Sequence, residues 1–367
     1  MPAELPLIHD APDERPGLPE DFVAIVLELK HWLGALRTRV DSRQAGPDGT
    51  KSPRDEDGED ARVLDVSSAL SQRFPQDFGR LEATLGDSSP TTRESAYAFF
   101  RTQMKDLYYA APFAARSLSK PLGYPGDYLT IDMIYADDPI GETTFARCVQ
   151  RYLLDEPAAR AVRNRGRYLA RILERRTERG PFTALSVGSG PAAELRELIG
   201  TGHANLRRSE FHLIDQDRAA LQHSEREIRR LGARTPNAPT VTYTRKNLKQ
   251  VIARGLGTAR YDLIYAAGLF DYLPDPVATA AARALIRHLA AQGRLIIGNF
   301  AKANPSRFGM EMALDWHLVH RSREDLRRLF HGIGTALQID EEELGVNLFC
   351  HISPRGAPSR DQERGVA

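Results

Sequence analysis

The chain of 367 residues is 41% hydrophobic and 27% charged, which is typical of a folded globular protein and excludes a largely disordered one. Its 50 Lys and Arg residues nearly cancel its 49 Asp and Glu residues, leaving a formal net charge of +1 at pH 7. Because no overall electric field would attract the chain to nucleic acid or to an anionic membrane, we expect neither as a partner.

Cysteine usage and the N-terminus favour a cytoplasmic protein. Cys148 and Cys350 match no metal or redox spacing, so we expect two buried thiols. Residues 1–21 are acidic and proline-rich, and lack the basic and apolar segments of a signal peptide. No later apolar run reaches the length of a membrane span.

The first 143 residues are predicted to form a helical cap. Apolar residues recur at helical spacing in residues 21–39, and periodicity is lost over residues 42–60, which predicts a flexible loop. Helical patterns resume at residues 63–74 and 91–118. The second of these opens on Thr91 and Glu94, a spacing that predicts an N-cap with a capping box.

Residues 144–180 are predicted to be two connecting helices, the second dense in arginine. We expect Val162, Leu169, Ile172 and Leu173 to face inward and the arginines to form a solvated face; phosphate binding is the alternative. From residue 181 onward, short apolar runs alternate with helical segments. This pattern predicts an α/β domain, residues 181–367, with a mostly parallel sheet.

The first strand of that domain ends in a glycine turn, Gly188-Ser189-Gly190. In an α/β sheet such a turn lets a ligand approach the backbone. Pro191 lacks an N–H group, and Ala193 stands where a dinucleotide motif would have its third glycine, so the turn is poorly suited to pyrophosphate. Glu194 would repel phosphate and could accept a hydrogen bond from an amino group. The pattern favours a zwitterionic ligand.

The following strands supply further candidate ligand residues. Asp215, with Gln216 beside it, ends the second strand where an acidic residue can accept from ribose hydroxyls, and Asp217 is a near rival. Asn247 could bond an adenine amino group while Leu248 covers the ring, or Asn247 could be a simple turn residue. After the fourth strand, the small residues Ala266 and Gly268 leave room for a ligand.

In chain order, the stretches VGSGPAAEL, LIDQD, KNL, YDLIYAAGLFDYLPD and GRLIIGNF resemble class I S-adenosylmethionine-dependent methyltransferases. The resemblance covers residues 182–354. It implies S-adenosylmethionine as the cofactor and a Rossmann-like, seven-stranded sheet. The sheet would end in an antiparallel hairpin to which residues 347–353 contribute.

Residues 120–135 and 304–326 resemble a bacterial methyltransferase group labelled as 3-hydroxy fatty acid methyl ester (extracellular factor) biosynthesis proteins. This narrower resemblance implies that the segment Gly-Tyr-Pro-Gly-Asp-Tyr, residues 123–128, folds over the cofactor. Tyr124, Asp127 and Tyr128 could cover a sulfonium by cation–π and charge attraction, and Tyr128 is also a catalytic candidate. A structural turn with packed tyrosines is the alternative.

The segment 301–326 is the candidate acceptor site. Glu311 and Asp315 are four residues apart and are expected on one helix face, where they could hold a cationic substrate or serve as a general base. A carboxylate acceptor would instead use Arg307 or Arg321. The structural alternative is that the two carboxylates cap the helix or pair with these arginines.

Four further residues complete this prediction. Trp316, His317 and Tyr272 are candidates for substrate binding. His317 and His320 lack a third partner, so we expect no metal.

The sequence therefore predicts a small-molecule methyltransferase with a helical cap, of the kind found in secondary metabolism, whose acceptor is a carboxylate, hydroxyl or amine. One alternative keeps the cofactor but lets its own amino group attack, which gives a cyclic product and methylthioadenosine. Another is a regulatory protein that binds S-adenosylmethionine without turnover. The oligomeric state is not predicted.

Overall fold

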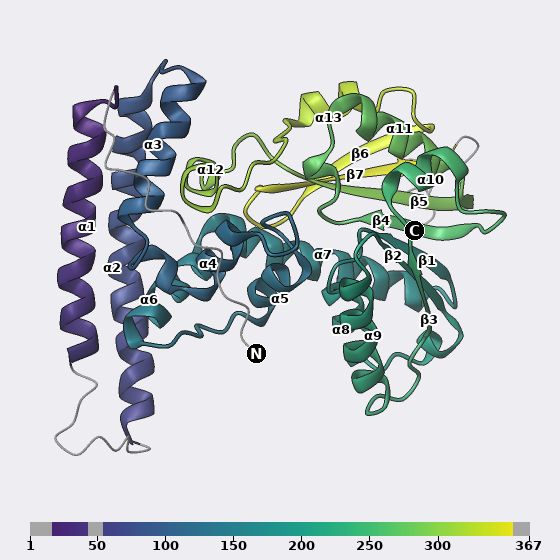
Figure 1. Ribbon diagram of the computed structural model, residues 1–367. Helices are drawn as coiled ribbons and strands as arrows, with labels where there is room; N and C mark the ends of the chain where they lie inside the picture. The colour runs from purple at the N-terminus through teal and green to yellow at the C-terminus, as the bar shows by residue number, and fades with distance from the viewer. Residues whose placement is uncertain (1–16, 43–53, 355–367) are drawn as a thin grey trace, which may run out of the picture. The chain divides into compact units, whose positions relative to one another are not determined.

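The computed structural model describes residues 17–42 and 54–354 (Figure 1). The chain divides into two compact units: unit 1 is Met1–Arg160 with Pro305–His317, and unit 2 is Ala161–Asn304 with Leu318–Ala367. This division differs from the predicted boundaries at residues 143 and 180. The first connecting helix belongs with the N-terminal helices, the second continues into unit 2, and part of the predicted acceptor segment returns to unit 1.

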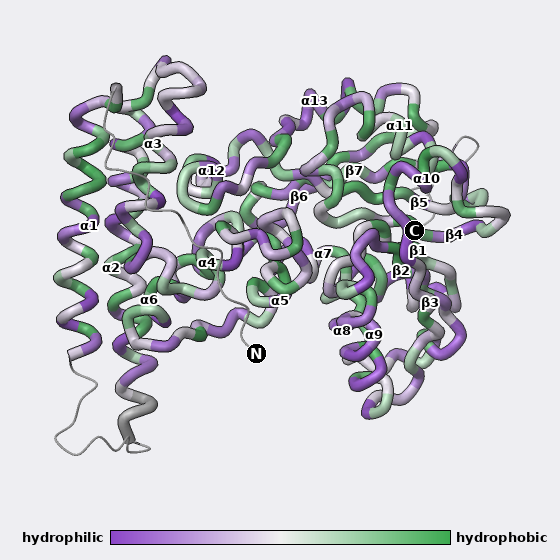
Figure 2. The backbone as a smooth tube through the Cα atoms, in the orientation of Figure 1, coloured by the Kyte–Doolittle hydropathy of each residue, from purple (hydrophilic) through white to green (hydrophobic). Residues whose placement is uncertain are grey.

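Unit 1 contains helices, joined by turns and loops, and no strand in its described part. Its elements are α1 (Glu20–Asp41), α2 (Arg54–Leu85), α3 (Pro90–Gln103), the 3-10 turn η2 (Tyr108–Ala110), α4 (Pro112–Ser119), α5 (Tyr128–Ala136), α6 (Thr144–Asp155), the start of α7 (Pro157–Glu178) and α12 (Arg307–Leu314). Hydrophobic and hydrophilic residues alternate along α1 and α2 (Figure 2), as expected for helices with one buried face.

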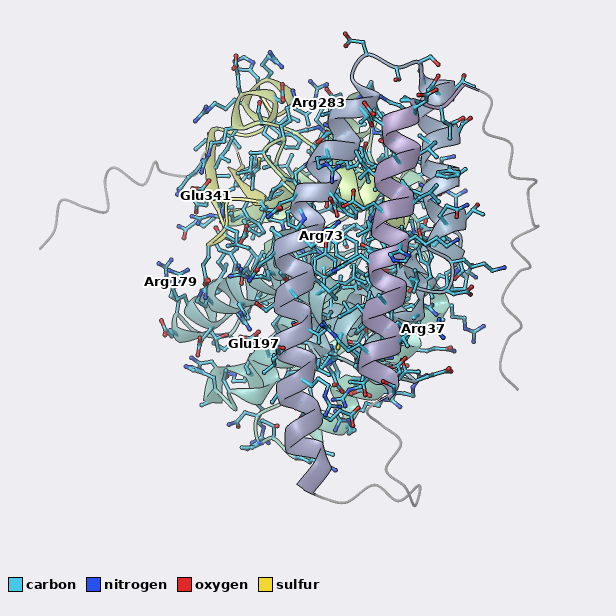
Figure 3. All side chains as sticks on the ribbon, turned by 90° about the vertical axis from the view of Figure 1, so that its left-hand side faces the viewer. Arg37, Arg73, Arg179, Glu197, Arg283 and Glu341 are labelled. Carbon is cyan, nitrogen blue, oxygen red and sulfur yellow. The ribbon has the colours of Figure 1, made fainter. Side chains whose placement is uncertain are left out.

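The two longest helices of unit 1 run side by side (Figure 3). Arg73 of α2 donates to Glu28 of α1 at 2.8 Å, and its guanidinium lies 5.1 Å from the centre of the Trp32 ring. Aromatic rings from α2, α3, α6 and α12 pack against one another, some edge to face and some stacked, which gives this unit its own core.

Two predicted details of unit 1 are wrong. Helix α2 begins at Arg54, so the segment from residue 54 to 60 is helical, while residues 43–53 lie outside the described residues. Contacts that the local sequence does not reveal hold this turn, because Glu59 accepts from Thr144 and pairs with Arg147 of α6. Helix α3 is capped by Ser89 and not by Thr91, since Pro90 supplies a first helical residue with a preset φ.

Unit 2 contains a seven-stranded sheet in the order β3-β2-β1-β4-β5-β7-β6. The first five strands pair in parallel and β7 is antiparallel to both β5 and β6, which confirms the predicted Rossmann-like α/β sheet with its terminal hairpin. The strands are β1 (Thr183–Val187), β2 (Glu210–Asp215), β3 (Thr240–Arg245), β4 (Tyr261–Ala266), β5 (Leu289–Phe300), β6 (Ala336–Glu341) and β7 (Asn347–Ser353).

Helices cover both faces of this sheet (Figure 1). One face packs on α7, α8 (Ala193–Gly200) and α9 (Arg218–Gly232), and the other on α10 (Leu248–Arg254), α11 (Asp275–Ile286) and α13 (Arg323–Leu329). Chain order along the sheet reverses between β1 and β4, and ligands of open α/β sheets bind at such a point, outside the carboxyl ends of the strands. The glycine turn after β1 lies there.

Candidate functional site

The N–H groups of the glycine turn donate to other groups of the protein. Those of Gly188 and Ser189 both donate to the Ile214 carbonyl, at 2.8 and 3.2 Å, and that of Ala192 donates to the Ser189 carbonyl at 3.0 Å. The Gly190 N–H donates to Asp215 Oδ2 at 2.9 Å, and Pro191 has none. A phosphate therefore finds no unused N–H group from residue 188 to 192, which agrees with the expectation that the turn does not suit pyrophosphate.

The backbone of this turn needs residues that tolerate left-handed conformations. Gly188 and Gly190 have φ values of +66° and +51°, and Ala192 shares this region at +50°. A Cβ atom on Gly188 would come within 3.3 Å of Leu269, whereas one on Gly190 would meet nothing within 4 Å. The Ser189 hydroxyl is buried and has no hydrogen-bond partner among the described residues. Such a buried, unpartnered group is what a bound ligand would satisfy.

Asp215 ends β2 and holds the turn. Its Oδ2 accepts from Gly190 N–H and its Oδ1 accepts from Asp217 N–H, both at 2.9 Å. Because a carboxylate has about four acceptor positions, Asp215 can also accept from a ligand hydroxyl. Burial raises the pKa of this carboxyl above its usual value. Its rival Asp217 caps α9 through Ala219 N–H at 2.8 Å, and Gln216 is exposed.

Glu194, in the first turn of α8, is 4% exposed and accepts from the Tyr265 hydroxyl at 2.9 Å. Burial raises the pKa of the Glu194 carboxyl, and hydrogen bonds from the backbone and from Tyr265, followed by the charges of Arg196 and Arg165, partly offset this effect. A ligand ammonium beside this buried carboxyl would favour its ionised form further.

The remaining predicted ligand residues of unit 2 also have structural roles. Asn247 caps α10 in a capping box with Gln250, which is the structural role left open for it, and Leu248 packs against the core. Ala266 is buried at the end of β4. The roles proposed for these residues in ligand binding stay predictions.

The arginine-rich helix α7 does not present only a solvated face. Val162, Leu169 and Leu173 are buried as expected, but Arg163, Asn164 and Arg165 are also buried, at 8%, 6% and 5% exposure. The prediction of a solvated arginine face is wrong at these positions. Arg165 was detectable in the sequence, because it lies three residues after Val162 and four before Leu169, on the same helical stripe.

In unit 1, Asp127 has a structural role. Its carboxylate is fully buried, accepts from Leu129 and Thr130 N–H as the N-cap of α5, and receives two hydrogen bonds from Arg116, at 3.0 and 2.6 Å. Tyr124 lies in the turn before α5 and Tyr128 is the first residue of that helix, and both are partly buried. The covering role expected of this segment stays a prediction.

The expected shared face of Glu311 and Asp315 is wrong. Helix α12 ends at Leu314, and Asp315 follows in a left-handed conformation with φ +49°. Its carboxylate is held by Lys120 and by Arg101, whose Nη2 lies 3.1 Å away. Although burial opposes ionisation of Asp315, these cations outweigh it and lower the pKa.

Other predicted acceptor residues of unit 1 are placed as follows. Glu311 pairs with Arg307 at 2.7 Å, which is the structural alternative. Trp316 is buried, whereas the His317 side chain is 58% exposed and lies 3.2 Å from Asp315. The acid–base and substrate roles of these residues stay predictions.

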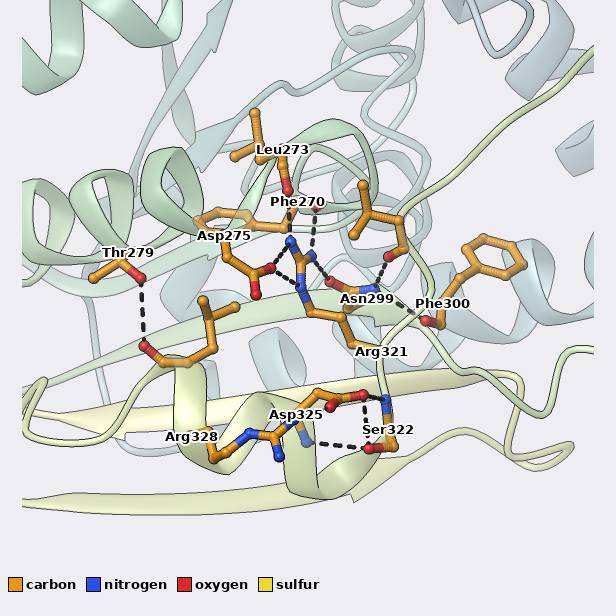
Figure 4. Close-up of polar contacts among 12 residues, drawn as sticks. Phe270, Leu273, Asp275, Thr279, Asn299, Phe300, Arg321, Ser322, Asp325 and Arg328 are labelled. Carbon is orange, nitrogen blue, oxygen red and sulfur yellow. Dashed lines mark hydrogen bonds and ion pairs between the residues drawn. The ribbon is translucent and has the colours of Figure 1, made fainter. Parts of the chain in front are cut away.

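In unit 2, Arg321 is committed to a network of its own (Figure 4). Its guanidinium donates to Asp275, to Asn299 Oδ1 at 2.6 Å and to the Phe270 and Leu273 carbonyls, so it has no donor left for an acceptor carboxylate. These bonds fix the loop after β4, which contains the turn η4 (Phe270–Tyr272) with the predicted substrate residue Tyr272.

Asp271, in the same turn, was not predicted. It is 2% exposed, and burial raises the pKa of its carboxyl to about 7, against the influence of Arg165, the Phe300 N–H and Arg321. Its Oδ1 accepts from Phe300 N–H at 2.6 Å. Only the fold brings it beside Arg165, whose Nη1 is 3.9 Å from Asp271 Oδ2.

Metal and thiol chemistry have little support in the described residues. Within residues 17–42 and 54–354, no group of three or more His, Cys, Asp or Glu side chains is placed to hold a metal ion. Cys148 and Cys350 are free and buried, as predicted, and burial raises the pKa of each thiol to about 12. No described helix combines the length and apolarity that crossing a membrane requires.

No protein-family model and no curated protein matches the chain. Among solved structures, the chain is similar to a "possible exported protein" from Bordetella parapertussis, with 18% identity, a TM-score of 0.50, and coverage of 83% of this chain and 100% of that one. At this identity the likeness bears on the fold alone.

Two similar structures with lower scores are methyltransferases. Magnesium protoporphyrin IX methyltransferase from Synechocystis with bound S-adenosylmethionine has 13% identity, a TM-score of 0.37, and coverage of 54% of this chain and 84% of that one. The N-methyltransferase NodS from Bradyrhizobium japonicum has 18% identity, a TM-score of 0.38, and coverage of 61% and 96%. Scores this low carry no argument about the site.

Proposed function

We propose that the chain binds S-adenosylmethionine and transfers its methyl group to a small-molecule acceptor. The observation that carries this proposal is the turn after β1, whose N–H groups are all used or missing while Asp215 stands beside it and can still accept from a ligand hydroxyl. Such a turn rejects a pyrophosphate and accepts a nucleoside whose ribose hydroxyls can donate.

The residues present fit this cofactor. Asp215 would accept from the ribose hydroxyls, the unpartnered Ser189 hydroxyl would bond the amino-acid end, and the buried Glu194 would face the ammonium group. Asn247 and Leu248 would flank the adenine. When bound, the sulfonium supplies an already activated methyl carbon, so the protein mainly has to align the acceptor and exclude water.

The candidate acceptors are a carboxylate, a hydroxyl and an amine. Asp315 and Glu311 are each paired with cations in unit 1, which argues against either being a ready general base. An acceptor that needs no proton removal is therefore favoured over a hydroxyl that needs a base.

Mass spectrometry of the protein incubated with S-adenosylmethionine alone tests this proposal. We expect bound, unconsumed cofactor, and S-adenosylhomocysteine only after an acceptor is added. Methylthioadenosine above the level without enzyme would instead establish the intramolecular reaction. Turnover absent with carboxylic acids, alcohols and amines alike would favour a regulatory protein.

Calorimetric titration with S-adenosylhomocysteine tests the cofactor site separately. Gly188→Val places a branched side chain against Leu269 at a left-handed position, so binding should be lost. Gly200→Ala is the matched control, because Gly200 has no left-handed φ and a Cβ there would meet nothing within 4 Å. Equal affinity in both folded variants would remove the glycine turn from the site.

A further inference from the structure

Arg165 is a buried cation with unsatisfied hydrogen-bonding capacity. Its side chain is 6% exposed, and its Nε has no hydrogen-bond partner among the described residues. The ion pair with Asp271 spans 3.9 Å, which is too long for a hydrogen bond. Burying a guanidinium in this way is unfavourable unless other hydrogen bonds or charges compensate for the lost water.

The protein leaves space for this guanidinium at the carboxyl end of β4. A Cβ atom on Gly268 would lie 2.7 Å from Arg165 Nη1 and 3.1 Å from Cζ. Gly268 does not have a left-handed φ, so its backbone conformation is open to other residues. A larger residue here would displace the neighbouring arginine, whereas the turn itself does not demand glycine.

The charge of this arginine acts on two carboxyl groups of the candidate site. The charge of Arg165 favours the ionised forms of both Glu194 and Asp271, while burial opposes them. Arg165 is therefore close enough to both carboxyl groups for its charge to act on them. A guanidinium presents a planar fork of donors that matches a carboxylate in two parallel hydrogen bonds.

We propose that Arg165 binds a ligand carboxylate beside Gly268, in a site formed by residues of unit 2. The carboxylate belongs either to the amino-acid end of S-adenosylmethionine, in which case the inference rests on the proposed function, or to the acceptor. The same geometry serves both sources, and titrations with different probes distinguish them.

The first experiment compares two nucleosides that differ in the amino-acid end. Arg165→Met keeps the length of the side chain and removes its charge. We expect the affinity for S-adenosylhomocysteine to fall by about 10- to 100-fold, as for the loss of a charged hydrogen-bonded pair, while the affinity for methylthioadenosine, which has no carboxylate, stays the same. Arg171→Met is the control on the same helix, because Arg171 is 49% exposed.

A second variant displaces the guanidinium without substituting Arg165. In Gly268→Ala the added methyl group meets only the far end of the flexible Arg165 side chain, so the fold should persist while the guanidinium moves. We expect the same selective loss for S-adenosylhomocysteine. Gly200→Ala, in open space, should change neither affinity.

Acetate identifies the source of the carboxylate, with neutral acetamide as its control. Acetate should raise the melting temperature of the wild type saturated with methylthioadenosine, and not that of Arg165→Met. If S-adenosylhomocysteine abolishes this effect, the cofactor supplies the carboxylate. If the acetate effect persists with S-adenosylhomocysteine bound, and Arg165→Met loses it without losing affinity for the nucleoside, the acceptor supplies it.

Two results would overturn the inference: an equal loss of affinity for both nucleosides in Arg165→Met, which indicates a structural arginine, or unchanged affinities together with the same acetate response in variant and wild type. If the wild type binds neither nucleoside, the proposed function fails. The acetate comparison on the ligand-free protein then still decides whether Arg165 binds a carboxylate.

Discussion

Asp215 does two things at once, and a substitution can separate them. It shapes the glycine turn through Gly190 N–H and, in the proposed function, binds the ribose. In Asp215→Asn one oxygen becomes an NH2 group, which cannot accept. We expect the affinity for S-adenosylhomocysteine to fall by about 10- to 100-fold, because hydrogen bonds to a charged group contribute ~1.5–3 kcal/mol each.

Asp217→Asn is the matched control in the same calorimetric titration. Asparagine caps helices as well as aspartate does, so α9 should keep its N-cap and the affinity should stay unchanged. If Asp217→Asn lost the affinity and Asp215→Asn kept it, the assignment of the ribose acid would be reversed.

The Asp271 carboxyl is expected to make the folded protein less stable as pH rises. Its folded-state pKa of about 7 lies above the ordinary value of 3.8, so the folded protein binds the extra proton between these values. The contribution is therefore fully present below about pH 4 and is lost as pH rises through 7. We expect Asp271→Asn, whose side-chain oxygen can still accept from Phe300 N–H, to lose less stability than the wild type between pH 5 and pH 8.

Urea unfolding at these two pH values measures the difference. Glu194 and Asp215 also have raised pKa values, and they are present in both proteins, so the contrast isolates Asp271. Parallel losses in wild type and variant would show that the Asp271 carboxyl titrates normally.

Site residues were predictable from the sequence where the local backbone requires a particular residue type. They were not predictable where contacts between distant segments decide their role. Gly188, Pro191 and Asp215 follow from the rules for a strand-to-helix turn. Asp271 and the partners of Asp315 are brought to their places by segments far apart in sequence, such as Arg101 and Lys120. No local pattern encodes such pairs.

At the scale of elements, Arg321 holds the loop after β4 against β5. It satisfies two backbone carbonyls, Asn299 and Asp275 while being 3% exposed. Arg321→Met removes the donors to the Leu273 carbonyl and to Asn299 Oδ1, and leaves the Phe270 carbonyl only its bond from Leu273 N–H. Since each buried acceptor left unsatisfied costs about 1–3 kcal/mol, we expect the free energy of unfolding in urea to fall by about 3–5 kcal/mol.

Two comparisons show which partners matter. Asp275 is 68% exposed, so Asp275→Ala should cost at most about 1 kcal/mol, and the exposed Arg327→Met should stay within about 0.5 kcal/mol of the wild type. If Asp275→Ala cost as much as Arg321→Met, the ion pair and not the carbonyl network would hold the loop.

The sheet was the most predictable element because its buried strands are short apolar runs separated by helices, and β7 falls on the expected residues. Helix ends were less predictable. Helix α2 extends into the expected loop, where Glu59 accepts a hydrogen bond from Thr144 of a distant helix. Helix α12 ends at Leu314, so Asp315 does not continue the helical face of Glu311. Such ends are decided by tertiary contacts, which a periodic pattern does not contain.

At the scale of the whole chain, the residues proposed to bind the nucleoside all belong to unit 2, whereas Tyr124, Asp127 and Tyr128 belong to unit 1. Amide hydrogen exchange reports each segment separately. On adding S-adenosylhomocysteine we expect slower exchange at residues 188–194 and 211–217, because ligand binding stabilises the turn and the strand end against local opening.

The same experiment tests the predicted covering segment. If residues 123–128 close over the ligand, their exchange should slow by a similar factor, and α1 provides the internal control because none of its residues is assigned to the site. Asp127 anchors this segment through Arg116, so slower exchange on adding the ligand would indicate a new contact. Unchanged exchange at residues 123–128, together with protection at the glycine turn, would leave Tyr124 and Tyr128 as packing residues of unit 1.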